Sequence, residues 1–466
     1  MSGEARLTWR TGAVVASVAI VVLVAMLIVA GNTEEQKPIG NNGGEPAMLT
    51  LDFAVWGSDE EIAAYQAMVD DYNASTKNTT VVVHDWPSAP AMVADLGEAK
   101  SVPDLYMLPR TLLADVIAEK RNLPLGDLIT AREIPVGDDF SRDAVTAFSV
   151  ADDLQCMPYS SSAMVIYYNA KLVDFERMAA LGRPTPPREH TGWNLSEFRA
   201  AAEFASRPRA RTKGVYIEPT LRGLAPFIYS GGGQVFDSDT EPTSLALGED
   251  DSIGALRNAL ELLRDPRVTL SSTQLEQRSA LDWFKRGRLG MIAGFRNLTP
   301  ELRATEGLEF DVMPMPSLGA PKTIGDLTGV CLSPGPGPRV GAAADFLKYL
   351  VSDEAMARIA ATGYLQPSTR SVALSEAFLQ PAQQPAHAAV FNDVLRSMIV
   401  PPLLEDGSEL QELVGPDIEA LLTTPDLGDL QELLRAIDEE SRSLLDPDYE
   451  PSDDVSDSGD LDDDES

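Results

Sequence analysis

The first third of the chain alternates between the hydrophobic period of a strand and that of a helix. Apolar residues occupy every second position over residues 49–55, and this period predicts a strand. Apolar residues at helical spacing over residues 62–72 predict a helix, which Ser58 and Glu61 precede at the spacing of a capping box. The same two patterns then predict strand 80–83, helix 89–99, strand 104–108 and helix 112–119. This order predicts an α/β fold with a parallel sheet and helices on both of its faces.

Aromatic and acidic residues follow two of the predicted strands. Trp56 ends the first strand, and Asp85 and Trp86 end the second. Because open parallel sheets bind ligands beyond the carboxyl ends of their strands, we expect these side chains to line an aromatic crevice. The alternative is that each tryptophan only covers the end of a helix.

The N-terminus contains a long apolar segment. Residues 13–30 are uncharged and almost wholly apolar, and Arg6 and Arg10 precede them. A helix of this length is about 27 Å long, close to the thickness of a bilayer core, and the arginines favour an inside N-terminus. We predict an uncleaved transmembrane anchor at 1–31 and a flexible tether at 32–47, with the rest of the chain outside the cell. A cleaved signal peptide is the alternative, although its apolar region is usually shorter.

Length and charge narrow the classes of protein further. A chain of 466 residues is too long for one compact core, so more than one lobe is expected. Its 72 acidic and 37 basic residues give a net charge of −35, which disfavours nucleic acid as a partner. The acids are concentrated at the C-terminus, where residues 451–466 contain almost nothing to bury and are predicted to be a disordered tail.

The sequence contains no recognisable catalytic or metal-binding motif. His84, His190 and His387 lie far apart and at no metal-ligand spacing, and Cys156 and Cys331 cannot build a structural zinc site by themselves. The chain has neither a Gly-x-Ser-x-Gly elbow nor a phosphate-binding Gly-x-x-x-x-Gly-Lys loop. We therefore predict a binding protein without cofactor or metal rather than an enzyme. An extracellular glycosidase is less favoured, because carboxylate pairs are uninformative in so acidic a chain.

Several segments within 48–375 occur in the order of one known family. They are LTLDFAVWGSDEEIAAYQAMVDDYNAS, PDLYML, CMPYSSSAMVIYYNAKLV, GWNLSEFRAAAEFA, FKRGRLGMIAGF, FDVMPMPSLG, GDLTGVCLS and GYLQPST. Together they resemble the bacterial extracellular solute-binding proteins of ABC importers (family 1), typified by maltose-binding protein. The resemblance implies a two-lobed, type II periplasmic-binding-protein-like fold with a hinge between the lobes.

The resemblance also implies limits for the lobes. The first lobe is expected at 48–155 with a return segment at about 331–375, and the second lobe at 156–330. Beyond 375 the resemblance fades, and periodicity alone predicts that helices at 376–450 pack on the lobes.

A sugar-binding cleft needs aromatic faces and a few polar groups, and the matched segments supply both. The ligand-binding residues that the resemblance implies are Trp56, Asp85, Trp86, Tyr159, Tyr229, Phe295, Arg296 and Asp326. Phe295 and Arg296 stand where the family usually has a tryptophan, which is a departure from the pattern. Residues 231–233 are three glycines, which either pack against a neighbouring helix or line the ligand.

The family implies a function in transport. We expect a monomer that delivers a sugar or oligosaccharide to ABC permease subunits, held in the cell membrane by a single N-terminal helix with its bulk outside. The alternative is a membrane-tethered sensor or envelope scaffold that uses the same fold.

The resemblance finally places Cys156 and Cys331 on the two strands that cross between the lobes. Those crossings run side by side in the family, and disulfides persist outside the cell. A disulfide between the two residues is therefore expected, and the alternative is a pair of buried free thiols.

Overall fold

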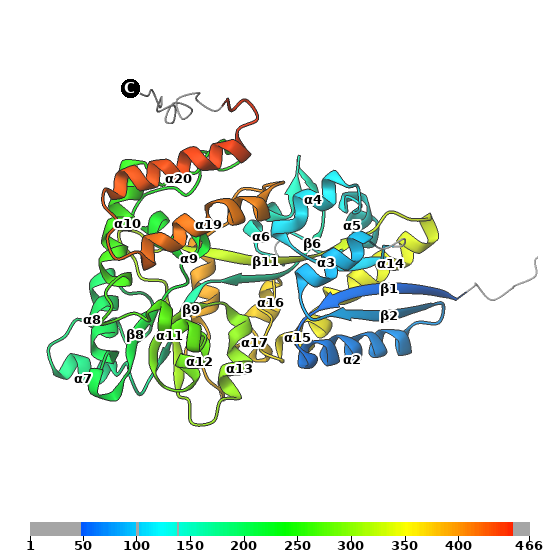
Figure 1. Cartoon of the computed structure of the whole chain (residues 1–466). Helices are drawn as coiled ribbons and strands as arrows, with labels where there is room; N and C mark the ends of the chain where they lie inside the picture. The colour runs from blue at the N-terminus through cyan, green and yellow to red at the C-terminus, as the bar shows by residue number, and fades with distance from the viewer. Residues whose placement is uncertain (1–47, 99–101, 138, 451–466) are drawn as a thin grey trace, which may run out of the picture. The chain divides into compact units, whose positions relative to one another are not determined.

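The computed structural model describes residues 48–98, 102–137 and 139–450, and Figure 1 shows the course of the chain. The predicted anchor at 1–31, the predicted tether at 32–47 and the predicted tail at 451–466 lie outside these residues. Within the described ranges, no helix is both long enough and apolar enough to cross a membrane.

The first sheet contains the strands that the N-terminal pattern predicts. β1 (Leu49–Trp56) pairs in parallel with β2 (Thr79–Trp86) and with β3 (Leu105–Pro109), which confirms the predicted parallel order. β11 (Thr323–Leu332) is antiparallel to β3 and also to β6 (Met157–Ala163). The short strand β12 (Met398–Ile399) adds to the start of β11. A separate hairpin is formed by β4 (Ser149–Val150) and β5 (Asp153–Leu154).

Helices cover the first sheet on both sides (Figure 1). They are α2 (Asp59–Ser75), α3 (Ala89–Glu98), α4 (Leu113–Ala118), α5 (Gly126–Arg132), α6 (Arg142–Ala147), α14 (Gly337–Leu350) and α15 (Asp353–Ala360). α2 begins after Ser58, whose side chain accepts a hydrogen bond from the Glu61 amide while the Glu61 carboxylate accepts one from the Ser58 amide. The predicted capping box is thus confirmed.

The second sheet has the order β10-β7-β9-β8. Its strands are β7 (Val165–Asn169), β8 (Lys213–Tyr216), β9 (Leu289–Gly294) and β10 (Phe310–Pro314). The helices that follow these strands are α7 (Phe175–Ala180), α8 (Leu195–Ala205), α9 (Leu221–Ser230), α10 (Asp250–Leu263), α11 (Ser272–Gln277), α12 (Ala280–Lys285) and α13 (Thr299–Arg303). Asn194 and Glu197 form a capping box at the start of α8.

Two hydrophobic cores meet at the second sheet. Side chains alternate between the two faces of a strand, and along β7 Val165 and Tyr167 join the core of the first sheet. Ile166 and Tyr168 on the same strand belong to the second core, which fills the opposite face. One continuous core therefore joins the first sheet to one face of the second.

Two strands carry the chain between the sheets. β6 leads directly into β7, and the segment after β10 leads into β11. β6 lies within the predicted second lobe, yet it pairs with β11 in the first sheet. Cys156 and Cys331 are joined by a disulfide with their Cα atoms 4.3 Å apart, so the expected pairing is confirmed.

The C-terminal part packs mainly through two long helices. The shorter segments are α16 (Arg370–Ala373), α17 (Glu376–Leu379) and α18 (Val390–Asp393), and the long helices are α19 (Gly407–Thr423) and α20 (Leu430–Leu445). Apolar residues of α19 and α20 complete the second core beside α9 and α10. On α20, the Asp438 carboxylate accepts hydrogen bonds from the amides of Leu247 and Gly248, and the Ser441 hydroxyl accepts one from the Leu245 amide.

A close approach of α8 to β8 makes Gly214 a sensitive position. A Cβ atom at Gly214 would lie 2.1 Å from the carbonyl oxygen of Ala202. We expect Gly214→Ala to destabilise the protein by roughly 1–3 kcal/mol, because the strand must move away from the helix. Gly254→Ala in α10 is the matched control, since its Cβ would meet nothing within 4 Å. Thermal unfolding of both variants measures the difference, and equal midpoints would contradict the packing argument.

Candidate ligand-binding site

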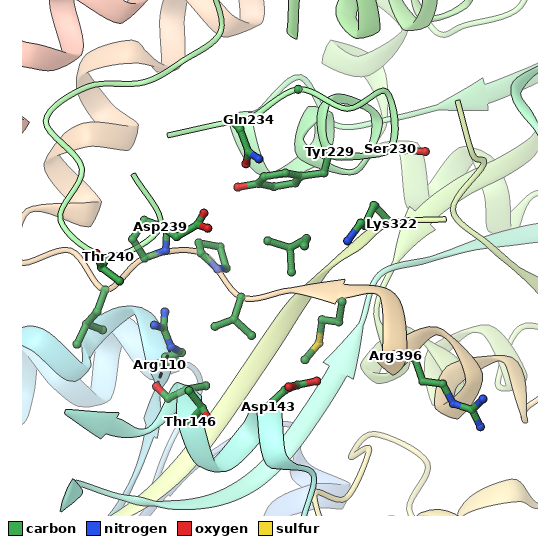
Figure 2. A pocket seen from close by; sticks show the side chains of 18 of the residues that line it. Arg110, Asp143, Thr146, Tyr229, Ser230, Gln234, Asp239, Thr240, Lys322 and Arg396 are labelled. Carbon is green, nitrogen blue, oxygen red and sulfur yellow. Dashed lines mark hydrogen bonds between the residues drawn. The ribbon is translucent and has the colours of Figure 1, made fainter. Parts of the chain in front are cut away.

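A large pocket lies where elements of the first sheet approach elements of the second (Figure 2). Its volume is about 1310 Å³. Five stretches of chain line it: the residue after β3, α6 with β4, the end of α9 with the loop that follows, the segment before β11, and the segment around β12. Figure 2 shows Tyr229 and Gln234 on one wall and Arg110, Thr146 and Asp143 on the opposite wall.

The end of α9 sets the position of Tyr229. Thr220 caps the start of this helix, and Ser230 ends it just before the three glycines. The Ser230 hydroxyl donates a hydrogen bond to the Ala320 carbonyl and accepts one from the Leu318 amide, which ties the helix end to the segment before β11. Tyr229 is thereby held on the wall of the pocket.

The three glycines allow a close approach of backbone to helix α10. A Cβ atom at Gly233 would lie 2.6 Å from the Cα atom of Ser252. Gly232 has φ +95°, a conformation that residues with a side chain rarely adopt. The close packing against a neighbouring helix is thus confirmed; the same three glycines also line the pocket, and their contact with a ligand stays a prediction.

The side chains that line the pocket include both hydrogen-bond donors and hydrogen-bond acceptors. Its ionisable and polar side chains are those of Arg110, Asp143, Thr146, Ser149, Tyr229, Ser230, Gln234, Asp239, Thr240, Glu241, Lys322 and Arg396. Cationic and carboxylate side chains are equally represented, so the wall is polar without a dominant charge. Burial raises the pKa of Tyr229 to about 12, with a smaller contribution from Asp239. The phenol therefore stays protonated and can both donate and accept a hydrogen bond.

Arg110 is held in place by the backbone. Its Nε donates a hydrogen bond to the Ala147 carbonyl, 2.8 Å away. Burial lowers the pKa of Arg110 to about 10, which leaves the guanidinium charged at neutral pH. Arg110 thus links the end of β3 to the end of α6 on the same wall.

Trp56 and Trp86 lie side by side, but away from this pocket. They are partners in the register of β1 and β2, as expected for residues at neighbouring strand ends. The Trp86 indole N–H donates a hydrogen bond to Asp95, and Asp85 is exposed. The Trp56 indole nitrogen is buried and has no hydrogen-bond partner among the described residues.

Phe295 and Asp326 meet at the other end of α9. The Arg222 guanidinium carbon lies 4.3 Å from the centre of the Phe295 ring, and an Arg222 nitrogen lies 3.2 Å from an Asp326 oxygen. Arg222 is in the first turn of α9, about 10 Å along the helix axis from Tyr229. The structure therefore brings Phe295 and Asp326 together, but not with Tyr229.

Arg296 and Tyr159 are completely buried. The Arg296 guanidinium lies over the rings of Phe378 and Phe391, at 4.7 and 5.1 Å, and its Nη2 donates a hydrogen bond to the Phe378 carbonyl. Burial lowers the pKa of Arg296 to about 10. In this arrangement both side chains belong to the packed interior, and contact with a solute would require them to become exposed.

Several pocket residues were not predicted from the sequence. Arg110 follows the end of β3, so the strand-end argument that selected Trp56 and Trp86 applies to it as well. Residues 396–403 line the pocket from a part of the chain where the family resemblance has faded. Lys322 carries no recognisable signal in the sequence.

Comparisons with known proteins identify the family. A search of curated proteins found no match. Among solved structures, the chain is similar to the ABC substrate-binding protein Lmo0181 from Listeria monocytogenes in complex with cycloalternan, with 17% identity, a TM-score of 0.73, and coverage of 85% of this chain and 98% of that one. It is similar to the GacH receptor of Streptomyces glaucescens, which was solved unliganded and with acarbose, with 18% identity, a TM-score of 0.69, and coverage of 86% and 100%. It is also similar to maltose-bound T. maritima MalE3, with 16% identity, a TM-score of 0.67, and coverage of 85% and 100%.

These likenesses show a two-domain, periplasmic-binding-protein-like α/β fold. Residues 67–389 match the model of one protein family, which is more than half of the chain. The chain belongs to the bacterial extracellular solute-binding proteins.

Proposed function

We propose that this protein binds an oligosaccharide in the pocket between the two sheets and delivers it to an ABC importer. The observation that carries this proposal is the size of the pocket. Pockets for drug-sized ligands usually measure about 300–1,000 Å³. At about 1310 Å³, this one has room for several sugar rings.

The chemistry of the wall supports a neutral polyol as the ligand. A sugar presents many hydroxyl groups, each of which donates and accepts, and the mixed wall of carboxylate, guanidinium, amide and hydroxyl groups can bind both functions. The Tyr229 ring offers an aromatic face for the C–H side of a sugar ring. A balanced wall favours no strongly charged ligand.

The related structures support the same class of ligand. Their bound molecules are cycloalternan, acarbose and maltose, all of them carbohydrates. We propose that this chain acts as a monomeric binding protein without cofactor, that ABC permease subunits are its partners, and that it does not alter its ligand. Recovery of intact oligosaccharide after prolonged incubation with the protein tests the last point.

Calorimetric titration with a panel of maltose, maltotriose, acarbose and cyclic tetrasaccharides tests the proposal. We expect Tyr229→Ala to weaken binding by roughly 1–3 kcal/mol, or about 5- to 150-fold, because it removes the aromatic face in the pocket. Lys322→Ala should weaken binding in the same direction.

Trp56→Ala and Trp86→Ala are the comparison variants in that titration, because they test the strand-end crevice that the sequence suggests. If these two lose affinity while Tyr229→Ala does not, the ligand binds at the strand ends instead. If the wild type binds no member of a broad sugar panel, carbohydrate is the wrong class of ligand.

We also propose that residues 13–30 anchor the protein in the membrane with its bulk outside the cell. The support is the length of the uncharged segment and the two arginines before it. We expect full-length protein to stay with membranes after washing with alkaline carbonate. Recovery of a soluble form that begins near residue 31 would instead show cleavage by signal peptidase.

A further inference from the structure

Two of the three histidines of the chain stack on each other beside β10 of the second sheet. The ring centres of His190 and His387 are 3.7 Å apart, with an angle of 27° between the planes. Asp311 lies beside both. We propose that His190, Asp311 and His387 form a binding site for a divalent transition metal of the zinc type. The long separation in sequence argued against such a site, but the fold removes that separation.

The three side chains are close enough to share one ion. One ligand atom from each residue lies within 4.8 Å of the other two. Ligand atoms in a tetrahedral zinc site lie about 2.0–2.2 Å from the metal, and therefore roughly 3.5 Å from one another. The ligand atoms are therefore near this spacing, and rotation of one side chain would bring them to it.

Asp311 is fixed in its position by the backbone. It lies on β10, and one of its oxygens accepts hydrogen bonds from the amides of Val312 and His387, at 2.9 and 3.0 Å. Its other oxygen lies 2.6 Å from Nδ1 of His387. A metal ion would take the place of the proton between these two atoms, and that proton would pass to solvent.

His190 has the outer contact that metal-binding histidines typically have. Its Nδ1 lies 3.0 Å from the Val312 carbonyl oxygen, so Nδ1–H donates there and Nε2 keeps its lone pair. That lone pair accepts a long hydrogen bond from the Tyr168 hydroxyl, 3.4 Å away, which a metal ion would replace. The rings of Tyr168 and Phe175 pack against His190 with centres 5.7 and 6.0 Å away, which limits the access of water. His190 and Asp311 are therefore buried and oriented, whereas His387 lies at the exposed side of the site.

Metal binding requires one imidazole to turn. The lone pair of an imidazole nitrogen lies in the plane of its ring, so two stacked rings do not direct their lone pairs at one metal position. His387 is the ring that turns, because its side chain is 38% exposed whereas His190 is buried and held by the Val312 carbonyl.

Two imidazole nitrogens and one carboxylate oxygen favour Zn²⁺, Co²⁺ or Ni²⁺ over Mg²⁺ or Ca²⁺, which prefer oxygen donors. The bound ion would join the segment around His387 to β10. Gln384 already binds the same strand, because its side-chain oxygen accepts a hydrogen bond from the Phe310 amide at 2.6 Å.

Titration of metal-free full-length protein with ZnCl₂ tests the proposal, with Co²⁺ absorption as a second reading of the coordination geometry. We expect one tightly bound ion per chain and a higher unfolding temperature with zinc. His190→Ala and His387→Ala should each weaken binding at least about tenfold. His84→Ala is the matched control, because His84 also pairs with an aspartate, Asp52 at 2.9 Å, but on the surface and without a second histidine.

His387→Gln keeps the volume of the side chain and guards against a simple loss of folding. If folded His387→Gln binds zinc as the wild type does, the proposal is wrong. It is also wrong if the wild type binds no zinc at about 100 μM, or if His84→Ala loses the ion as completely as His387→Ala.

Discussion

Removing the disulfide between Cys156 and Cys331 should lower the free energy of unfolding by about 5 kcal/mol. The two residues are 175 positions apart, and a cross-link that closes so long a loop strongly restricts the unfolded chain. For a folded part of about 400 residues, this loss corresponds to a fall of roughly 6 °C in the unfolding midpoint. Thermal unfolding of the Cys156→Ala/Cys331→Ala double variant measures it.

The wild type treated with reductant is the control for that experiment, since it loses the cross-link without a change of side chain. Both samples should unfold at the same lower temperature. Alkylation of unfolded, unreduced protein followed by intact-mass analysis shows whether the bond is present. Two alkylated thiols in that sample would contradict the structure.

Two substitutions of Arg296 should distinguish the contribution of its side-chain volume to the free energy of unfolding from that of its charge. Arg296→Ala leaves a large cavity between Phe378 and Phe391, and we expect a loss of roughly 3–5 kcal/mol, as for other large-to-small core substitutions. Arg296→Met keeps most of the volume and should cost much less. In the wild type, the Nε and Nη1 atoms of Arg296 have no hydrogen-bond partner within the described ranges. The buried charge is therefore poorly compensated, and its loss should change the free energy of unfolding little.

Denaturant unfolding of both Arg296 variants measures these losses, and sugar titration supplies the second reading. If the residue acts through packing alone, folded Arg296→Met binds sugar as the wild type does. An equal loss of stability in both variants would contradict the cavity argument. A selective loss of sugar binding in Arg296→Met would support the role that the family resemblance implies.

The local hydrophobic pattern predicted the elements of the fold, but not every pairing between distant strands. The alternation over 49–55 and the helical spacing over 62–72 place β1 and α2 nearly as the structure has them, because the apolar positions of both patterns are largely the buried ones. The position of β11 between β3 and β6 could not be derived from periodicity, because strand pairing across such a distance leaves no local pattern. The family resemblance supplied only the place of this strand beside β6, as the two crossings between the lobes; its pairing with β3 was not predicted.

The site was predictable only in part. Trp56 and Trp86 do lie together, because the carboxyl ends of neighbouring parallel strands share an edge. Tyr229 does line the pocket. The burial of the Arg296 side chain could not be predicted, because the rings that cover it belong to Phe378 and Phe391, beyond the end of the resemblance. Side-chain burial depends on such distant partners, which no local sequence pattern contains.

The position of β11 late in the sequence affects how the chain folds during synthesis. A ribosome releases the chain from its N-terminus, so β3 and β6 are made long before residues 323–332, which later pair with both of them. Until then the facing edges of both strands offer unpaired amides and carbonyls, the kind of edge that pairs with other chains. A nascent chain halted before residue 323 would therefore be prone to aggregate. Successful folding requires that the edges of β3 and β6 do not pair with other chains before β11 is made.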